Sequence, residues 1–290
     1  MKSLSREAST MATTFERITN TDEVFNNKEY ITDSIIFNAI ESARNTPDCK
    51  LYSDRKNVII LFAANSPRIW LWTSTTIKDD TNKLIDICRF LRDSNVPKAE
   101  IYLKEEVAGS FSDLYALTTL EINYSVKDEF SLAVYTCTKK DTENRPELAP
   151  DEEIIRIDKD NPEHKKMVLD FYESLKEEFR WQEKLERKVN EYLNMEFYAL
   201  VKNGRIVGNA VIGGQTKQYL RIKSIAVRES ERQKGFGYKM CIFALDKIRE
   251  RGLTPILYTH VGNKSAVALW SKSGFNVKDK LYLLKIENDD

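Results

Sequence analysis

The sequence predicts a mixed α/β fold in which helices flank a central, mostly antiparallel β-sheet. Apolar segments on both sides of Asn203-Gly204 predict a β-hairpin, because this dipeptide is preferred in two-residue hairpin turns. An alternating stretch, Tyr219–Val227, predicts a strand that passes through a charged, glycine-containing turn into a helix that stops before Gly252. A further strand, a short helix and a last strand follow. Elements in this order pack as helices on a sheet.

The composition excludes several classes of protein. With 290 residues the chain is long enough for one large or two ordinary domains. Its 45 Lys and Arg balance 45 Asp and Glu, which argues against a nucleic-acid partner. No apolar run is long enough to span a bilayer, and the first twenty residues lack a signal-peptide core. Four cysteines show neither a C-x-x-C motif nor metal-ligand spacing. We therefore expect a cytoplasmic protein with reduced thiols, no metal and no membrane partner.

The first half begins with residues 1–20, which are rich in Ser and Thr and predict a mobile tail. Asp79-Asp80-Thr81 predicts the capped start of a helix with an apolar face through Leu84, Ile87, Cys88 and Leu91. The other elements expected here are a helix over 31–43, strands over 57–64 and 68–74, a strand over 100–104, a helix over 110–119, and strands over 121–125 and 130–138.

A charged segment with two prolines and no periodicity, Lys139–Glu153, predicts a linker, so we place a domain boundary between residues 145 and 146. Asn161-Pro162 then opens a helix, and a second amphipathic helix is expected over 181–194. The aromatic residues of this helical pair could border an acceptor pocket, but core packing is the better expectation for each. They are Tyr172, Phe179 and Trp181.

The turn before the predicted helix, Arg232–Gly237, combines two cations with two glycines. The first amides of a helix have no internal partner and carry the positive end of its dipole, so they can bind phosphate. The alternative is a tight turn whose glycines serve packing. Taken alone, the string R-x-x-G-x-G favours that alternative, and it is neither G-x-G-x-x-G nor a Walker loop.

The neighbouring segments add a second motif. The strand containing Leu257-Tyr258 leads into N-x-x-A-x-x-L-W-x-x-x-G-F, which starts at Asn263. Together with the hairpin and Arg232-x-x-Gly235-x-Gly237, it makes the stretch from about Asn194 to Ile286 resemble the GNAT superfamily of N-acetyltransferases, in its glycine-N-acyltransferase-like branch. The resemblance implies a GNAT fold and transfer of an acyl group from acetyl-CoA, or another acyl-CoA, to a primary amine in a ternary complex.

The first half repeats a similar order of elements but has no equivalent of the glycine loop. We therefore expect two GNAT-like domains in tandem, a degenerate one over 21–145 without a CoA loop and a catalytic one over 146–290. An unrelated α+β domain in the first half is the alternative.

The resemblance also implies roles for individual residues. Backbone amides of the loop would grip the pyrophosphate, two cations would add charge, the strand before the loop would present main-chain groups to the pantetheine arm, and Asn263 would bind the arm or cap its own helix. The implied CoA-binding residues are Ile225, Ala226, Val227, Arg232, Gln233, Lys234, Gly235, Phe236, Gly237, Tyr238, Asn263 and Trp270.

The catalytic groups are less clearly marked. Relatives often carry tyrosine, as the acid for the leaving thiolate, where this chain has Trp270, and an indole is not a usable proton donor. His260 is the best candidate for the acid, because histidine titrates near neutrality; a purely structural histidine is the alternative. Tyr258 is a lesser candidate, and Glu196 could act as a base through water.

Two function classes follow. The first is an acyl-CoA-dependent N-acyltransferase for a small amine or an amino acid, with Arg221 and Lys223 available to attract an acidic acceptor; a protein N-terminal or lysine acetyltransferase is a variant of it. The second is a non-catalytic acyl-CoA sensor. Either class would act as a monomer or a homodimer.

Overall fold

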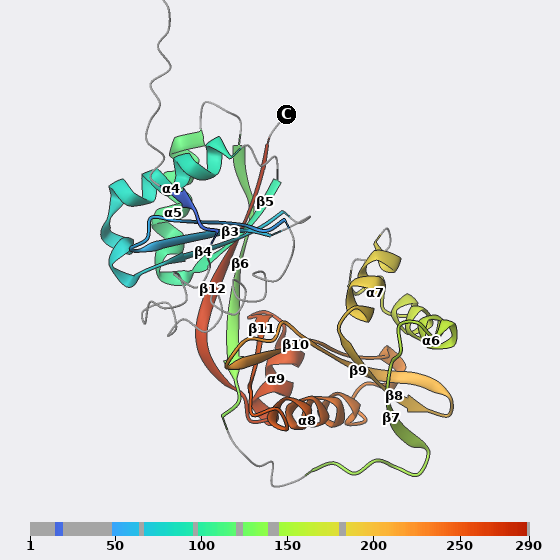
Figure 1. The fold of residues 1–290 in the computed structure, drawn as a ribbon. Coiled ribbons are helices and arrows are strands. Elements are labelled where there is room, and N and C mark those ends of the chain that lie inside the picture. The colour runs from blue at the N-terminus through green and yellow to red at the C-terminus, as the bar shows by residue number, and fades with distance from the viewer. Residues whose placement is uncertain are drawn as a thin grey trace, which may run out of the picture. The chain divides into compact units, whose positions relative to one another are not determined.

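The computed structural model describes residues 15–19, 48–63, 67–94, 98–119, 124–138, 145–179 and 184–288. The chain divides into two compact units. Unit 1 comprises Met1–Ser131 together with Leu281–Asp290, and unit 2 comprises Leu132–Lys280 (Figure 1). Each unit is a mixed sheet with helices packed on it, which confirms the predicted fold class.

Unit 1 is built on a sheet with the order β1-β2-β3-β4-β5-β12. Neighbouring strands are antiparallel except β4 and β5, which are parallel over three residue pairs. The C-terminal strand β12 contributes Leu281–Glu287, paired with β5. The elements are β1 (Glu16–Arg17), β2 (Lys50–Ser53), β3 (Val58–Phe62), β4 (Arg68–Thr73), the 3-10 helix η1 (Thr75–Asp79), α4 (Thr81–Asp93), β5 (Lys98–Lys104), α5 (Glu105–Thr119) and β12 (Asn276–Asn288).

The α4 helix starts and packs as its sequence predicts. The Asp80 side chain caps it by accepting a hydrogen bond from Lys83 N at 3.0 Å. The four apolar residues expected on one face are all buried in the core of unit 1. The long strand β6 (Tyr124–Thr136) replaces the two strands expected over 121–138. The helix expected over 31–43 lies outside the described residues.

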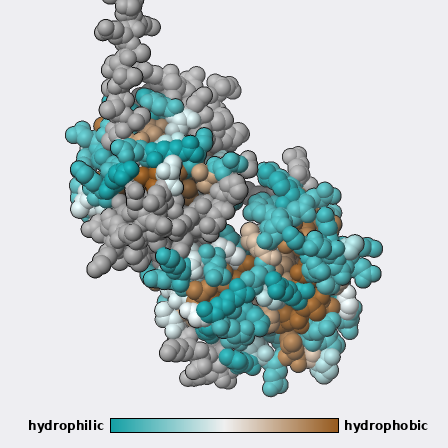
Figure 2. Space-filling view, viewed as in Figure 1, coloured by the Kyte–Doolittle hydropathy of each residue, from teal (hydrophilic) through white to brown (hydrophobic). Residues whose placement is uncertain are grey.

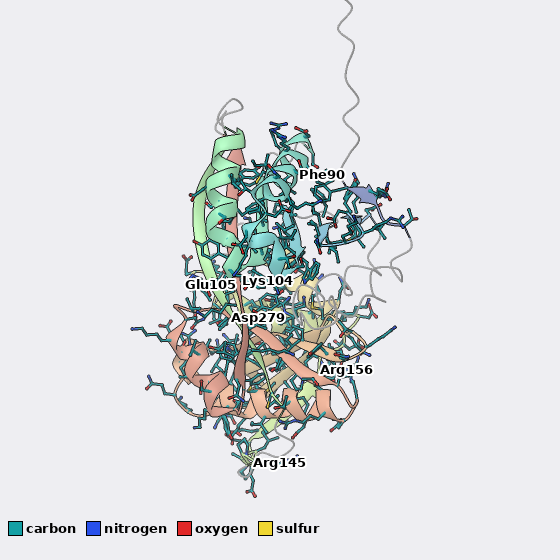
Figure 3. All side chains as sticks on the ribbon, turned by 90° about the vertical axis from the view of Figure 1, so that its left-hand side faces the viewer. Phe90, Lys104, Glu105, Arg145, Arg156 and Asp279 are labelled. Carbon is teal, nitrogen blue, oxygen red and sulfur yellow. The ribbon has the colours of Figure 1, made fainter. Side chains whose placement is uncertain are left out.

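The tail predicted over 1–20 is wrong for the described part of that segment. Phe15 and Ile18 are buried, and β1 between them pairs with β2. The Phe15 ring packs edge-on against Phe90 of α4, with centroids 5.1 Å apart (Figure 3). The apolar residues Phe15 and Ile18 therefore indicated an ordered, buried segment better than the surrounding Ser and Thr residues indicated a tail.

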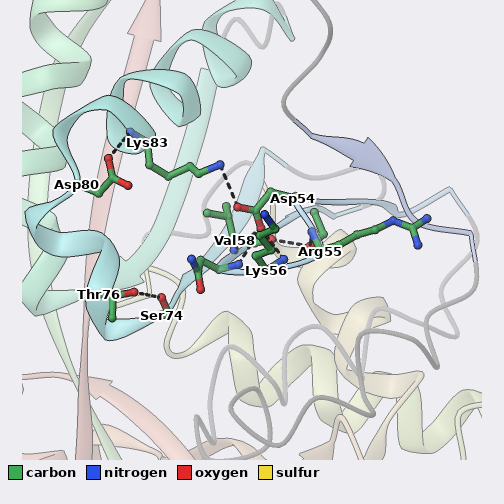
Figure 4. A network of polar contacts seen from close by, with 10 residues as sticks. Asp54, Arg55, Lys56, Val58, Ser74, Thr76, Asp80 and Lys83 are labelled. Atoms are coloured by element: carbon green, nitrogen blue, oxygen red, sulfur yellow. Dashed lines mark hydrogen bonds and ion pairs between the residues drawn. The ribbon is translucent and has the colours of Figure 1, made fainter.

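A carboxylate organises the β2–β3 hairpin of unit 1 (Figure 4). Asp54 Oδ1 accepts hydrogen bonds from the amides of Lys56, Asn57 and Val58 at 2.8–3.0 Å, and Oδ2 lies 3.0 Å from Lys83 Nζ of α4. Burial acts to raise the pKa of Asp54, but these donors together outweigh it and lower the pKa below its ordinary value. The charged form thus ties the hairpin to α4.

Unit 2 has the sheet order β6-β11-β10-β9-β8-β7, with β10 and β11 as a parallel pair. Helices α8 and α9 pack on one face of the sheet, while α6 and α7 pack on the other. Beyond Leu132–Thr136 of β6, its elements are β7 (Glu152–Arg156), α6 (Pro162–Glu173), α7 (Leu185–Leu193), β8 (Glu196–Lys202), β9 (Arg205–Gly213), β10 (Tyr219–Val227), η2 (Glu229–Glu231), α8 (Phe236–Arg249), β11 (Thr254–His260) and α9 (Lys264–Lys272).

Most elements of unit 2 lie where the sequence predicts them. The hairpin turn has positive φ at Asn203 (50°) and Gly204 (72°), as a type I′ turn requires. Asn161 caps α6, with Pro162 at its first position. Strand β7 was not foreseen; it starts at Glu152, inside the predicted linker, so the boundary proposed at 145/146 falls within unit 2. Tyr172 is fully buried, Phe179 is partly buried, and Trp181 lies outside the described residues.

The strict alternation expected along β10 is wrong beyond Ile222. A β-bulge at Lys223 shifts the register, since Ile222 pairs with Ile212 and Ser224 with Val211. The extra residue reverses the side-chain phase. Ser224 therefore reaches the α6 face, where it bonds Tyr172, and Ile225 joins the α8 face. Before the bulge, Leu220 and Ile222 lie together on the α8 side of the sheet.

Candidate active site

The loop between β10 and α8 forms the amino-terminal end of α8. Gly235 is the N-cap residue in a left-handed conformation (φ 87°), and no side chain caps this end among the residues that the structure describes. The first hydrogen bond of the helix runs from Lys239 N to Gly235 O at 3.0 Å. Backbone amides ahead of Lys239 therefore point out of the helix, at the positive end of its dipole.

Glycine has a different structural role at each of the two glycine positions of the loop. Gly235 needs the left-handed φ of the turn. A Cβ at Gly237 would meet only Leu269 Cδ2 and Val227 Cγ2, both at 3.6 Å, which is ordinary van der Waals contact. Glycine inside a helix costs about 1 kcal/mol relative to alanine. Packing inside the protein therefore does not require a glycine at position 237, and this glycine lowers the stability of the helix.

The two cations of the loop form exposed ion pairs. Arg232 pairs with Glu178 and donates from Nε to Val227 O at 3.3 Å, and Lys234 Nζ lies 3.0 Å from Glu231. Pairs this exposed contribute about 0–1 kcal/mol. A polyanionic ligand can therefore replace the carboxylates as partner of either cation.

An opening in the sheet lies beside the loop. The parallel pairing of β10 with β11 covers Tyr219–Arg221 and Thr254–Ile256 and ends there, although the structure describes every residue of both strands. Beyond that point β10 stays paired with β9 as far as Val227, and β11 stays paired with β6 as far as His260. The two strands separate towards the amino-terminal end of α8.

The main-chain groups at this opening differ from those expected. Ala226 N donates to Asn209 Oδ1 at 3.0 Å, so the polar groups of Ala226 point towards β9 and away from the opening. Successive residues of a strand direct these groups to opposite edges. The edge of β10 that faces the opening therefore carries the main-chain groups of Ile225 and Val227. Ala226 was expected to present its main-chain groups to the pantetheine arm. Its amide already has a protein partner, so this expectation is wrong for Ala226.

His260 and Tyr258 both lie on β11 beside the opening. His260 is exposed at the end of the strand, and its Nδ1 accepts a hydrogen bond from Gly262 N at 3.0 Å. Tyr258 stacks under the guanidinium of Arg221, with Cζ 3.4 Å from the ring centroid. Leu257 packs with α8, so the alternating Tyr258 and His260 face the opposite, α6 side of the sheet.

Glu196 does not join this group. Its carboxylate accepts two hydrogen bonds from the guanidinium of Arg251, which follows the far end of α8, and a third from Tyr198 at 3.1 Å. The bonds from Arg251 lower its pKa. A carboxylate so engaged is a poor base, and the role suggested from the sequence is withdrawn. Glu196 instead lines a cavity of about 640 Å³ at the other end of the strands from the loop, together with Gly213 and Arg156. Arg156 is labelled in Figure 3.

Asn263 and Trp270 belong to α9. Asn263 Oδ1 accepts from Ala266 N at 3.1 Å, so its capping role is present. Trp270 is buried (7% exposed), and its indole Nε1 has no hydrogen-bond partner among the described residues. An orphaned buried donor costs roughly 1–3 kcal/mol and calls for an explanation.

Asn209 and Arg228 are not among the site residues that the sequence predicts. Asn209 is fully buried in β9 and bonds both Ala226 N and the Tyr172 hydroxyl. Arg228, also buried, donates from Nε to Ile206 O at 2.7 Å and pairs with Asp170 of α6, which anchors the start of the loop. The sequence does mark Asn209, because it is the one polar side chain within the apolar run Ile206–Ile212, where a buried amide needs hydrogen-bond partners.

The described residues contain no group of His, Cys, Asp and Glu side chains arranged to hold a metal ion. No helix within the described ranges is long and apolar enough to cross a membrane. On the face of unit 2 seen in Figure 2, hydrophilic residues surround smaller hydrophobic areas.

Comparison with known proteins agrees with this geometry. Residues 168–275 match the model of the acetyltransferase (GNAT) family. No curated protein sequence matches the chain.

Similar solved structures include a Drosophila protein (12% identity, 83% of this chain and 80% of that chain, TM-score 0.62). Another is a tandem GNAT protein from the clavulanic acid biosynthesis pathway (9% identity, 93% and 97%, TM-score 0.58). A third is an acetyltransferase of the GNAT family from Colwellia psychrerythraea (13% identity, 94% and 99%, TM-score 0.56). At these identities the likeness concerns the fold alone, and it extends over both units. Residues 168–275, the part of the chain that matches the family model, lie within unit 2.

Proposed function

We propose that unit 2 is an acyl-CoA-dependent N-acyltransferase, which transfers acetyl from acetyl-CoA to the primary amine of a small molecule or an amino acid. The observation that carries the proposal is the uncapped start of α8 beside the sheet opening, with Gly237 kept as glycine although nothing in the protein packs against it closely. Exposed amides at a helix start bind phosphate, and a bare Cα lets it approach.

The residues present fit an acyl-CoA. The amides of Gln233–Tyr238 would hold the pyrophosphate, with Arg232 and Lys234 as counter-charges. The main-chain groups of Ile225 and Val227 would bind the pantetheine arm at the opening. When bound, acyl-CoA supplies an acyl group activated as a thioester.

The α6 side of the opening would receive the acceptor amine. An alkylammonium must lose its proton before it can attack. His260 is exposed on that side, and histidine is the side chain suited to moving a proton near neutral pH. The Arg221–Tyr258 pair closes the narrow end of the opening and would attract an acidic group of the acceptor.

Calorimetric titration tests the ligand. Acetyl-CoA and desulfo-CoA should both bind, and NAD should not. Gly237→Glu should abolish the affinity, because it places a carboxylate against the phosphates, whereas Gly237→Ala, its matched control, should fold and weaken binding only in part. Unchanged affinity of the Gly237→Glu variant would refute the phosphate site.

An acyl-CoA sensor without catalytic activity is the second candidate. The engagement of Glu196 by Arg251 favours it, because the one carboxylate suggested as a base is unavailable. A thiol-release assay over a panel of amines and amino acids separates the two. Turnover that falls at least tenfold in His260→Ala, with acetyl-CoA affinity retained, supports the enzyme; binding without any thiol release supports the sensor.

We propose that unit 1 is a degenerate GNAT-like domain that binds no CoA. Its strands β4 and β5 repeat the short parallel pairing of β10 and β11. The helix that follows β4 already has a carboxylate, Asp80, bonded to its first turn. That negative charge occupies the place where a phosphate would bind and would repel one. The stoichiometry of acetyl-CoA is therefore expected to be one per chain.

A further inference from the structure

A buried polar network lies on the α6 face of the sheet, directly after the bulge in β10. The hydroxyl of Tyr172, from α6, accepts a hydrogen bond from Asn209 Nδ2 at 2.8 Å and shares another with the side chain of Ser224. Asn209 Oδ1 accepts a hydrogen bond from the backbone amide of Ala226 at 3.0 Å. Tyr172 and Asn209 are both fully buried. Three elements, α6, β9 and β10, thus meet at one phenolic oxygen.

The network holds β10 at two points. Ser224 is the first residue after the bulge, and Ala226 is the residue whose amide turns towards β9. Ile225 lies between them. Its main-chain groups face the opening, where β10 has no strand partner to hold it in place. The position of the Ile225 amide therefore depends on the two bonded residues that flank it.

Tyr172 cannot act on a ligand itself. Its side chain is fully buried, and it packs against Phe171 and Phe197. Burial, with Tyr192 nearby, raises its pKa well above the ordinary value, so it stays a neutral phenol. Its hydroxyl can serve only to bond its neighbours. A phenylalanine would fill the same space, so the hydroxyl is present for these bonds and not for packing.

We propose that Tyr172 is a positioning residue, which acts through Asn209 and Ser224 to fix the Ile225 amide at the acyl end of the opening. Hydrogen-bond donors stabilise a developing charge only when they are held in place beforehand, and small displacements are costly. The effect of Tyr172 on catalysis rests on the proposed function. The fixing of β10 by Tyr172 does not depend on that function.

The test compares Tyr172→Phe with Val168→Ala in the full-length protein. Val168 is a fully buried residue of the same helix and belongs to the same apolar cluster, but it has no polar group in the network. The first readout is amide hydrogen exchange in the absence of CoA. In Tyr172→Phe, protection at Ala226 should fall at least tenfold more than at Leu245 in the centre of α8. In Val168→Ala, protection should fall by the same factor at both.

The second readout is turnover. Tyr172→Phe should lower kcat about tenfold while the Kd for acetyl-CoA stays within threefold, and Val168→Ala should keep kcat within threefold. Equal loss of protection at both amides in Tyr172→Phe, or equal loss of kcat in both variants, would overturn the assignment. If Tyr172→Phe fails to fold, Ser224→Ala, which removes one bond of the network, takes its place. If the wild-type protein binds CoA but transfers no acyl group, the proposed function fails, and hydrogen exchange still decides whether Tyr172 fixes β10.

Discussion

At the start of β8, the carboxylate of Glu196 accepts hydrogen bonds from Arg251 and Tyr198, with Arg251 Nη1 at 2.6 Å from Oε1. Two parallel bonds between a guanidinium and a carboxylate are the strongest form of ion pair in proteins. Only 24% of the Glu196 side chain is exposed, so solvent screens the pair incompletely. The pair fastens the segment after α8 to the first residue of β8, which is a structural role.

Glu196→Gln should therefore destabilise the protein without changing acetyl-CoA affinity. Because the folded-state pKa of Glu196 lies below its reference value of 4.5, the stability it contributes is present above that value and is lost as the pH falls through the folded pKa. The variant should lose about 1–3 kcal/mol at pH 7. Urea unfolding at a series of pH values checks this: the gap to wild type should shrink below about pH 4.5. A gap that widens in acid would contradict the ion pair.

At the scale of elements, helices α8 and α4 both follow a strand and a short 3-10 turn, yet their amino-terminal ends differ. The α8 helix starts at Gly235 without a side-chain cap, whereas α4 starts at Asp80, which bonds Lys83 N. A side-chain cap stabilises a helix by about 1 kcal/mol. One helix is thus stabilised by its own carboxylate, and the other keeps its amides available for a ligand.

Asp80→Ala should lower the free energy of unfolding by about 1 kcal/mol through loss of the cap. Asp79→Ala, the neighbouring change outside the cap, should stay within about 0.5 kcal/mol of wild type. Thermal or urea unfolding measures both. Equal effects of the two substitutions would show that the Asp80 carboxylate does not cap α4.

The elements of unit 2 were predictable because local chemistry specifies them. Asn203-Gly204 sets a hairpin turn, Asn161-Pro162 starts a helix, and apolar periodicity marks α8. The bulge at Lys223 was not predictable, because an extra residue in a strand leaves no composition signal and depends on partners in β9 and α6. The same holds for the Glu196–Arg251 pair, whose members are 55 residues apart. The partner of the candidate base Glu196 was therefore less predictable than the position of the loop between β10 and α8.

At the scale of the whole chain, the sheet of each unit ends in a strand from the other half of the sequence. Leu281–Glu287 completes the sheet of unit 1, and Leu132–Thr136 completes that of unit 2. A sequence read from left to right suggests one boundary, but strand pairing is a long-range property that no local pattern records. A cut at residues 145/146 would remove the edge strand beside β11.

Leu284→Ala tests the assignment of the C-terminal strand. Leu284 is fully buried in the core of unit 1, so the substitution should cost about 2–5 kcal/mol there, with acetyl-CoA affinity within threefold of wild type. Leu245→Ala, equally buried in unit 2, is the matched control and should weaken binding as well as stability. Unfolding curves and calorimetry distinguish the two. Loss of CoA affinity from Leu284→Ala alone would contradict the division.

Titration of isotope-labelled protein with desulfo-CoA, followed through the backbone amide resonances, tests whether the start of α8 binds CoA. We expect one equivalent of ligand to shift the resonances of Gly235–Tyr238 and Ile225, whereas those of Gly213 and Gly214, which line the separate 640 Å³ cavity, should not move. Unchanged resonances at Gly235–Tyr238 at saturating ligand, or shifts confined to Gly213 and Gly214, would contradict it.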